Sequence, residues 1–548
     1  MLTLASDRVA RTERDYALQQ RELAASSART MISELASTLQ NLSAPIEYRL
    51  KTLNEAVEIF DRIDSTNRGE SDPGQTPVQL RAEVQTDLAL ARALEELGDA
   101  HGAVHRAEMA ESRAKKLLAA EGSDAENQLL MANALLEKSR AQSKAGDAAT
   151  ATSTLEQALN QLRALERANL DVNVRHSLEV LLCQALILKA KASDELVNPE
   201  VTNQLIAEAI ANGERAYNAQ PSEPEVVDYY ARSLEELGRF YFDSGNPELF
   251  QEPVKKALAI RKNAARKTPD NTALQRGSER AIADWGCLLA YFDPSGNNIA
   301  RAAESVGILR RLHDADPDNI NLAEELLGQS ENFATFLADR QQYRQASGLF
   351  EEIITQARRL IQNKKESHEV AYCMGEAAFD VFFCYVKLGN YEAANRIDAE
   401  AVEPLAAEFW KQKWDTPSDH MLQACFDFVS GELLSRGGEH QRAREIFQRG
   451  IDRLEENLRI RNFPGEKALY GESLVKFGNA LARGSDIKLG VEYVKRGLEI
   501  MLPLLDAKLT LTRGELSVDI SEAEDDLRRY EKELQKTDGG ASLVAGNK

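Results

Sequence analysis

The side chains between residues 101 and 108 have types and spacing that can bind a metal ion. His101 and His105 lie four residues apart and Glu108 follows three residues later, so all three can share one face of a helix. Two histidines and one glutamate beside a turn also describe the solvated start of an ordinary helix. We favour the solvated helix start, because this combination is common at surface turns, and we predict no metal site and no cofactor.

No sequence motif for catalysis accompanies these residues. The chain has no glycine-rich phosphate loop, no GxSxG, HExxH or EF-hand pattern, and no kinase signature. Asp314, Asp316 and Asp318 surround Pro317, which is typical of a helix end and not of a cation site. The sequence therefore predicts a protein that is not an enzyme.

The elements that position these side chains recur along the chain with a period of roughly 45 to 51 residues. A turn residue marks each of nine units: Gly98, Gly146, Ser193, Gly245, Gly296, Gln341, Gly389, Gly438 and Ser485. Glycine suits a helix end because it adopts the left-handed conformation without strain, and an Asp or Asn after it can cap the next helix. The pattern predicts helical hairpins stacked in one array over residues 78–508.

The composition is that of a folded, soluble helical protein. Hydrophobic residues make up 43% and charged residues 28% of the 548, and strand signals are nearly absent. A net charge of −21 argues against a nucleic-acid partner, because phosphate binding needs an excess of Lys and Arg. No apolar run approaches the roughly 20 residues of a membrane span. The five scattered cysteines indicate buried free thiols in a reducing compartment, so we expect a cytoplasmic protein.

The segments outside the array are predicted to extend or cap it. Residues 1–42 indicate a polar linker or weak coiled-coil helix, and residues 43–77 indicate an amphipathic helix and a loop. Residues 509–536 are expected to form a C-terminal capping helix with the polar outer face that a solenoid needs for solubility. Residues 537–548 are expected to be a disordered tail.

Small and aromatic residues recur at fixed distances from the turns. The eighth unit contains Gly431, Gly438, Ala443, Phe447 and Gly450, where small residues let two helices approach and the aromatic ring fills the space beside them. This pattern resembles the tetratricopeptide repeat (TPR), with about 14 residues added to its 34-residue unit. The resemblance implies an all-α protein, a right-handed α-solenoid of about nine TPR-like helical hairpins with long second helices.

In tetratricopeptide arrays the first helix of each unit lines the concave surface. Transferring that register to this chain implies a groove-facing set: Arg92, Arg140 and Arg239, preceded by Gln85 and Asn133. A stripe of guanidinium groups can clamp the carboxylates of an acidic or carboxylate-bearing partner. The alternative is that the arginines pair with Glu95 and Glu235 on neighbouring helical turns.

The same face becomes apolar in the C-terminal units. It carries Phe379, Phe383, Cys425 and Phe428. Such a face favours either a groove for an amphipathic helix or packing within the protein itself.

Two functions are compatible with these patterns. The first is a non-enzymatic scaffold or sensor that binds a peptide segment or a partner protein in its concave groove. The order of a polar lead helix, a second helix and then repeats also resembles the C-terminal half of bacterial signalling or defence proteins. That resemblance implies the second function, the regulatory sensor half of a Ser/Thr kinase, TIR-like or caspase-like enzyme whose effector is absent from this chain.

Overall fold

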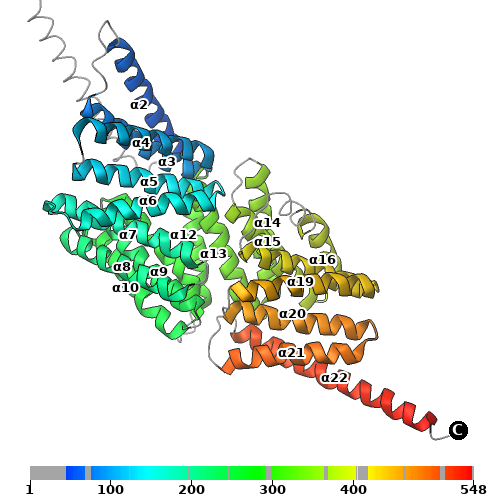
Figure 1. Cartoon of the computed structure of the whole chain (residues 1–548). Helices are drawn as coiled ribbons and strands as arrows, with labels where there is room; N and C mark the ends of the chain where they lie inside the picture. Colours follow the sequence, from blue (N-terminus) through cyan, green and yellow to red (C-terminus); the bar gives the residue numbers. More distant parts are fainter. Residues whose placement is uncertain are drawn as a thin grey trace, which may run out of the picture.

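The chain is organised as a row of antiparallel helical hairpins (Figure 1). The computed structural model describes residues 45–67, 76–122, 124–194, 198–244, 246–291, 298–362, 368–402, 404, 417–460, 464–506 and 513–545. Every regular element in these ranges is a helix, and none is a strand. The predicted all-α class is therefore confirmed.

Nine hairpins, which we call units 1 to 9, lie within the described ranges, as predicted. In chain order their helices are α3 (Pro77–Leu97) with α4 (Ala100–Glu121), α5 (Ala125–Lys144) with α6 (Ala148–Glu166), α7 (Val172–Asp194) with α8 (Pro199–Ala219), α9 (Pro224–Asp243) with α10 (Pro247–Lys267), α11 (Thr272–Tyr291) with α12 (Asn298–Ala315), α13 (Ile320–Ala338) with α14 (Tyr343–Gln362), α15 (His368–Lys387) with α16 (Tyr391–Ile397), α18 (Pro417–Arg436) with α19 (His440–Ile460), and α20 (Pro464–Arg483) with α21 (Ile487–Asp506). Helix α2 (Ile46–Asn67) precedes the row and α22 (Arg513–Ala545) follows it.

The residues added to the standard repeat are shared between the two helices of each unit. Second helices such as α4 and α10 have 22 and 21 residues, which confirms that they are long. First helices such as α3 and α5 are just as long, with 21 and 20 residues. Unit 7 differs, because α16 has 7 residues and continues into the five-residue π-helix η1 (Asp398–Val402).

The turns at Gly98 and Gly438 have the conformations that their sequences predict, whereas Ser193, the predicted turn residue of the third unit, still lies within α7. Gly98 and Gly438 adopt φ values of 91° and 84°, in the left-handed region. The side chain of Asp99 then caps α4 by accepting a hydrogen bond of 2.8 Å from the backbone N–H of Gly102. Gln341 and Ser485 also have positive φ, at 60° and 73°, so two units make this turn without glycine.

Small residues determine how closely the helices of a hairpin pack. Helix α4 buries Ala103, Ala107, Ala110 and Ala114 completely, a spacing of three and four residues that gives one continuous apolar face. In unit 8 a Cβ atom on Gly431 would lie 2.7 Å from the ring of Phe447, so only glycine fits there. The close packing expected from the tetratricopeptide-like residues is therefore present.

The row of units curls until its beginning meets its middle. Helix α3 of unit 1 contacts α13 of unit 6. At this contact, which we call the seam, the backbone N–H of Ile46 donates a 3.0 Å hydrogen bond to Oδ1 of Asp316, 270 residues away. Asn319 Nδ2 donates to Glu96 Oε2 at 3.0 Å, and Gly98 packs against Ile320. Units 1 to 6 thus form one closed turn.

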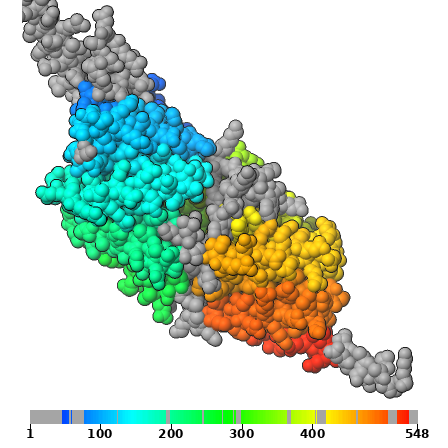
Figure 2. Space-filling model, viewed as in Figure 1, coloured from blue at the N-terminus to red at the C-terminus, as the bar shows by residue number. Residues whose placement is uncertain are grey.

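The remaining units form a second stack. Figure 2 shows the N-terminal units in blue to green and the C-terminal units in yellow to red as two masses that meet along a diagonal. In the C-terminal stack α22 covers α21 and buries Ile520, Ala523 and Tyr530. Helix α22 therefore lies over the last hairpin of the described chain.

Helix α22 extends further than predicted, because it continues to Ala545 instead of ending at residue 536. The expectation of a disordered tail over residues 537–548 was wrong up to that point. The chain continues a helix that is already nucleated, so no new nucleation step is needed, although each glycine of the pair at 539–540 costs about 1 kcal/mol relative to alanine. The helix predicted for residues 1–42 lies outside the described residues.

Candidate functional site

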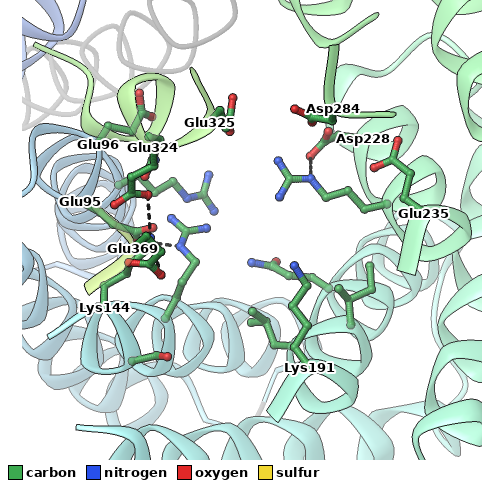
Figure 3. Close-up of a pocket in the computed structure, with 18 of the residues that line it drawn as sticks. Glu95, Glu96, Lys144, Lys191, Asp228, Glu235, Asp284, Glu324, Glu325 and Glu369 are labelled. Carbon is green, nitrogen blue, oxygen red and sulfur yellow. Dashed lines mark hydrogen bonds and ion pairs between the residues drawn. The ribbon is translucent and has the colours of Figure 1, made fainter. Parts of the chain in front are cut away.

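The closed turn surrounds a channel with a volume of about 2120 Å³ (Figure 3). Its wall is made mainly by the first helices of units 1 to 6, which are α3, α5, α7, α9, α11 and α13, as the groove prediction required. The seam completes the wall with Arg49, Glu96 and Asn319. The seam is polar, and Arg49 Nη1 donates a 3.0 Å hydrogen bond to Glu96 Oε1.

The structure places Arg92, Arg140 and Arg239 in the channel wall, but the first two are already engaged. Arg92 Nε donates to Glu137 Oε1 at 2.7 Å. Arg140 donates to Glu95 Oε2 at 2.7 Å and forms a second ion pair with Glu137 at 2.9 Å. Glu95 was named in the alternative as a partner on a neighbouring helical turn, but its partner is Arg140 of the next unit.

The pKa values of this network follow from its geometry. The negative charge of Glu137 raises the pKa of Arg92 further above its ordinary value. Burial disfavours the charge of Glu137, which is 1% exposed, yet Arg140 and Arg92 together hold the pKa of its carboxyl group below the ordinary value. These groups therefore remain charged, and neither arginine is free to take a new carboxylate without losing an existing partner.

Arg239 has a different environment. Its side chain is 59% exposed, and its contact with Glu236 is long, at 3.8 Å. The guanidinium carbon lies 5.8 Å from the centre of the Trp285 ring. Arg239 is thus the member of the predicted stripe with the most accessible charge, although Glu235 pairs with Arg261 at 3.0 Å and not with Arg239.

Gln85 and Asn133 lie outside the channel lining. Each is seven residues before its arginine, which places it about two turns away along the first helix. Gln85 is exposed and Asn133 is half-buried. Their role as groove residues stays a prediction, and the channel itself does not bring them to the arginines.

The channel wall also carries carboxylates that the sequence analysis did not single out. Figure 3 shows Glu95, Glu96, Glu324, Glu325 and Glu369 on one side and Asp228, Glu235 and Asp284 facing them from α9 and α11. The spacing of Asp228 and Glu235, seven residues apart on one helix face, was the available signal. Only the closed turn of the structure shows that Asp228 and Glu235 face the carboxylates of unit 6.

The apolar residues predicted for the C-terminal face divide into two groups. Phe428 is 1% exposed and packs on Phe447 at 6.0 Å between ring centres, so it belongs to the core, the internal-packing alternative. Phe379 and Phe383 are half-buried and contact each other at 4.9 Å. Lys476 Nζ lies 3.9 Å from the ring centre of Phe383, so a cation covers part of this pair.

Carboxyl groups gather beside these aromatic residues. Thr335 Oγ1 lies 2.9 Å from Oε1 of Glu331 and 3.4 Å from Oδ2 of Asp380. Burial, followed by the charge of neighbouring carboxylates, raises the pKa of Glu331 to about 8 and that of Glu376 to about 7. These two groups can therefore hold protons near neutral pH.

The described residues contain no cluster of three or more His, Cys, Asp or Glu side chains arranged for a metal ion. The four cysteines whose side chains are described are free thiols. Burial raises the pKa of Cys183 to about 12 and raises those of Cys373 and Cys425 as well. A thiol with a raised pKa is a poor nucleophile, so these cysteines do not indicate thiol catalysis.

No protein-family model matches this chain, and no curated protein matches it. Solved structures give matches of low similarity. The apo form of RapI shares 14% identity with a TM-score of 0.45, covering 78% of this chain and 99% of RapI. A Rap protein complexed with competence and sporulation factor shares 14% identity with a TM-score of 0.37, covering 74% and 100% of the two chains.

Tom70 from yeast covers more of this chain but fits it less closely. It shares 13% identity with a TM-score of 0.29, covering 94% of this chain and 99% of Tom70. Similarities of this degree add nothing on function. Across the described helices, none combines the length and the apolar character that crossing a bilayer requires.

Proposed function

We propose that this protein is a non-enzymatic binding module that receives a peptide segment in the channel of its closed turn. The observation that carries the proposal is the channel itself, with about 2120 Å³ enclosed by the first helices of six units. Sites for small molecules usually have about 300–1,000 Å³. The channel is larger than such a site, and its continuous wall favours an extended segment over a folded domain.

The lining supports the same function. It mixes charged side chains with apolar ones such as Ile187, Leu188 and Trp285. A peptide offers backbone hydrogen-bond groups and side chains of both kinds, so it can use the whole surface. Among the side chains that the structure describes, none of those lining the channel is a cysteine.

A bulky side chain placed in the channel tests the proposal. Ser143 on α5 lines the channel and is exposed, so Ser143→Trp should fill part of the space without disturbing helix packing. The measurement is the amount of a random synthetic decapeptide mixture that the immobilised protein retains, determined by mass spectrometry. We expect the native chain to retain peptides. The amount of retained peptide that is lost in Ser143→Trp should be at least ten times the amount lost in its control variant.

The control is Ser112→Trp, because Ser112 is an exposed residue of α4 outside the channel lining. Equal retention by the native chain and Ser143→Trp would place any binding elsewhere. No retention by the native chain would contradict a peptide-binding channel.

Two finer hypotheses belong to the same proposal. A carboxylate-bearing partner, as the arginine stripe suggests, would have to displace the existing partners of Arg92 and Arg140. A role as the sensor half of a bacterial signalling or defence enzyme would be supported by an effector encoded in frame beside this segment.

The buried free thiols support a reducing, cytoplasmic setting.

A further inference from the structure

The channel has more negative than positive groups in its wall. Thirteen Asp and Glu residues line it, against ten Arg and Lys residues. Each of the ten cations contacts at least one carboxylate; the longest of these contacts, Arg276 with Asp316, measures 3.9 Å. The positive charge of the wall is therefore already compensated from within the protein.

Two carboxylates in the wall are not compensated in this way. Glu225, at the start of α9, and Asp284, on α11, form no hydrogen bond or ion pair with any residue that the structure describes. Glu225 is exposed to the solvent, and Asp284 is half-buried. Burial raises the pKa of the Asp284 carboxyl group above its ordinary value, and the nearby Arg280 offsets this only in part. A cation placed beside Asp284 would favour its charged form, and a cation beside Glu225 would meet a carboxylate that has no partner among the described residues.

A third group in the wall points to the same kind of ligand. Gln184 on α7 is 3% exposed, and its amide lies near the carboxylate of Glu137, whose pKa it helps to hold below the ordinary value. A carboxylate accepts hydrogen bonds, so the amide nitrogen of Gln184 faces Glu137 and its oxygen points elsewhere. That oxygen has no partner among the described residues. A buried acceptor without a donor is costly, and a ligand N–H can satisfy it.

We infer that the channel takes a peptide segment carrying at least one lysine or arginine, with its cation held by Glu225 or Asp284. This inference rests on the proposed function and adds the chemical class of the ligand. The unused hydrogen-bonding capacity named above consists of acceptors, and a basic peptide supplies donors from both its side chains and its backbone. The arginines of the predicted stripe then hold the wall together and are not the clamp.

The apolar part of the wall favours a peptide over a small polyamine. Leu188 on α7 and Leu288 on α11 line the channel and are only half-buried, so they offer apolar surface to a ligand. A polyamine has no side chain to bury against these groups, whereas residues flanking a lysine can do so.

The test compares two labelled decapeptides that differ only in charge. One alternates lysine with alanine and leucine, and the other has glutamate in place of every lysine. Fluorescence anisotropy at physiological salt measures the affinity of each for the full chain. We expect the lysine peptide to bind at least tenfold more tightly than the glutamate peptide.

Isosteric substitutions identify where the cation binds. Glu225→Gln with Asp284→Asn removes two charges and should weaken binding of the lysine peptide at least fivefold. The control, Glu392→Gln with Glu456→Gln, removes two charges from exposed positions on α16 and α19, outside the channel, and should change the affinity less than twofold. Circular dichroism checks that both variants keep their helices.

Each of the other outcomes contradicts one part of the inference: the site of the cation, the charge of the peptide, or the peptide as the ligand. Equal weakening by both double variants would mean unspecific attraction to a chain of charge −21. Tighter binding of the glutamate peptide would overturn the inference while leaving the peptide-binding function in place. Displacement of the lysine peptide by equimolar spermidine would replace the peptide with a small polycation. Failure of both peptides, with retention of the random mixture, would overturn the inference alone.

Discussion

The closed turn of units 1 to 6 and the open stack of units 7 to 9 use the same hairpin, and both pair charges across neighbouring units, but the closed turn arranges its charges around a channel. In the closed turn, cations and carboxylates on the first helices pair across neighbouring units, as Arg92 does with Glu137. At the border between the two parts, Glu331 of unit 6 and Glu376 of unit 7 have raised pKa values, because both carboxyl groups are buried and each lies near another carboxylate. The comparison shows that the hairpin determines the scaffold, while a few concave positions determine what each part can bind.

The largest predicted effect is a loss of stability in the C-terminal stack that leaves the closed turn unchanged. Phe447 is fully buried and lies between Phe428 and Phe477. Phe447→Ala should cost about 3–5 kcal/mol in the C-terminal stack, because it removes a large buried ring and leaves a cavity. Hydrogen exchange measured segment by segment should show faster exchange in α18 to α21 and unchanged exchange in α3 to α9, since repeats interact with their neighbours.

A milder change at the same position provides the control. Phe447→Leu keeps most of the buried volume and should cost less than about 1.5 kcal/mol. Faster exchange throughout both parts in Phe447→Ala would show that the two stacks unfold as one unit.

A substitution at the seam is the second test of the difference between the two parts. Glu96 accepts hydrogen bonds from Arg49 and Asn319, so Glu96→Ala removes the carboxylate that both side chains contact at the seam. The expected cost is about 2 kcal/mol, since a hydrogen bond to a charged group contributes about 1.5–3 kcal/mol. Small-angle scattering should show a larger radius of gyration if the turn opens.

Glu121→Ala is the matched control for the seam. Its ion pair with Arg81 measures 3.1 Å and is about one-third exposed on both sides, so its loss should cost less than about 1 kcal/mol. An unchanged radius of gyration in Glu96→Ala would mean that contacts such as Ile46 with Asp316 suffice to keep the turn closed.

The protonation of Glu331 on α13 and Glu376 on α15 should make the stability of these two helices depend on pH. A carboxyl group whose pKa is raised by folding holds a proton that the unfolded chain releases near pH 4.3. Its stability contribution is complete below that pH and is lost as the pH rises toward 7 and 8, the values for Glu376 and Glu331. We expect α13 and α15 to lose about 1–3 kcal/mol of protection from hydrogen exchange between pH 5 and 8.

Gln substitutions isolate this effect. Glu331→Gln with Glu376→Gln keeps the shape of the side chains without a titrating proton, so the loss between pH 5 and 8 should largely disappear. The same loss in this double variant would assign the pH dependence to other groups.

The smallest predicted effect is at Arg239. Its side chain is mostly exposed and its ion pair with Glu236 is long, so Arg239→Gln should change stability by less than about 0.5 kcal/mol. The variant therefore tests binding without a folding defect. If the glutamate decapeptide binds the native chain and loses affinity in Arg239→Gln, the carboxylate clamp is supported at this position, and unchanged affinity removes Arg239 from it.

The sequence by itself determined the hairpins of this protein. Residues such as Gly98, Asp99 and Gly438 act within a few positions of themselves, where they end one helix and begin the next. Close packing between Gly431 and Phe447 is also local to one unit, so its residues show it directly. Such features depend on backbone conformation and side-chain size, both of which can be read from neighbouring positions.

Only the tertiary structure decided the channel. Small rotations between successive units add up until Ile46 meets Asp316, and no single unit contains that sum. The closure then determines which charges face one another, so Arg92 pairs with Glu137 of the next unit, and Glu225 faces the channel without a partner among the described residues. Electrostatic partners depend on distances of a few ångströms between helices, which the order of residues along the chain does not specify.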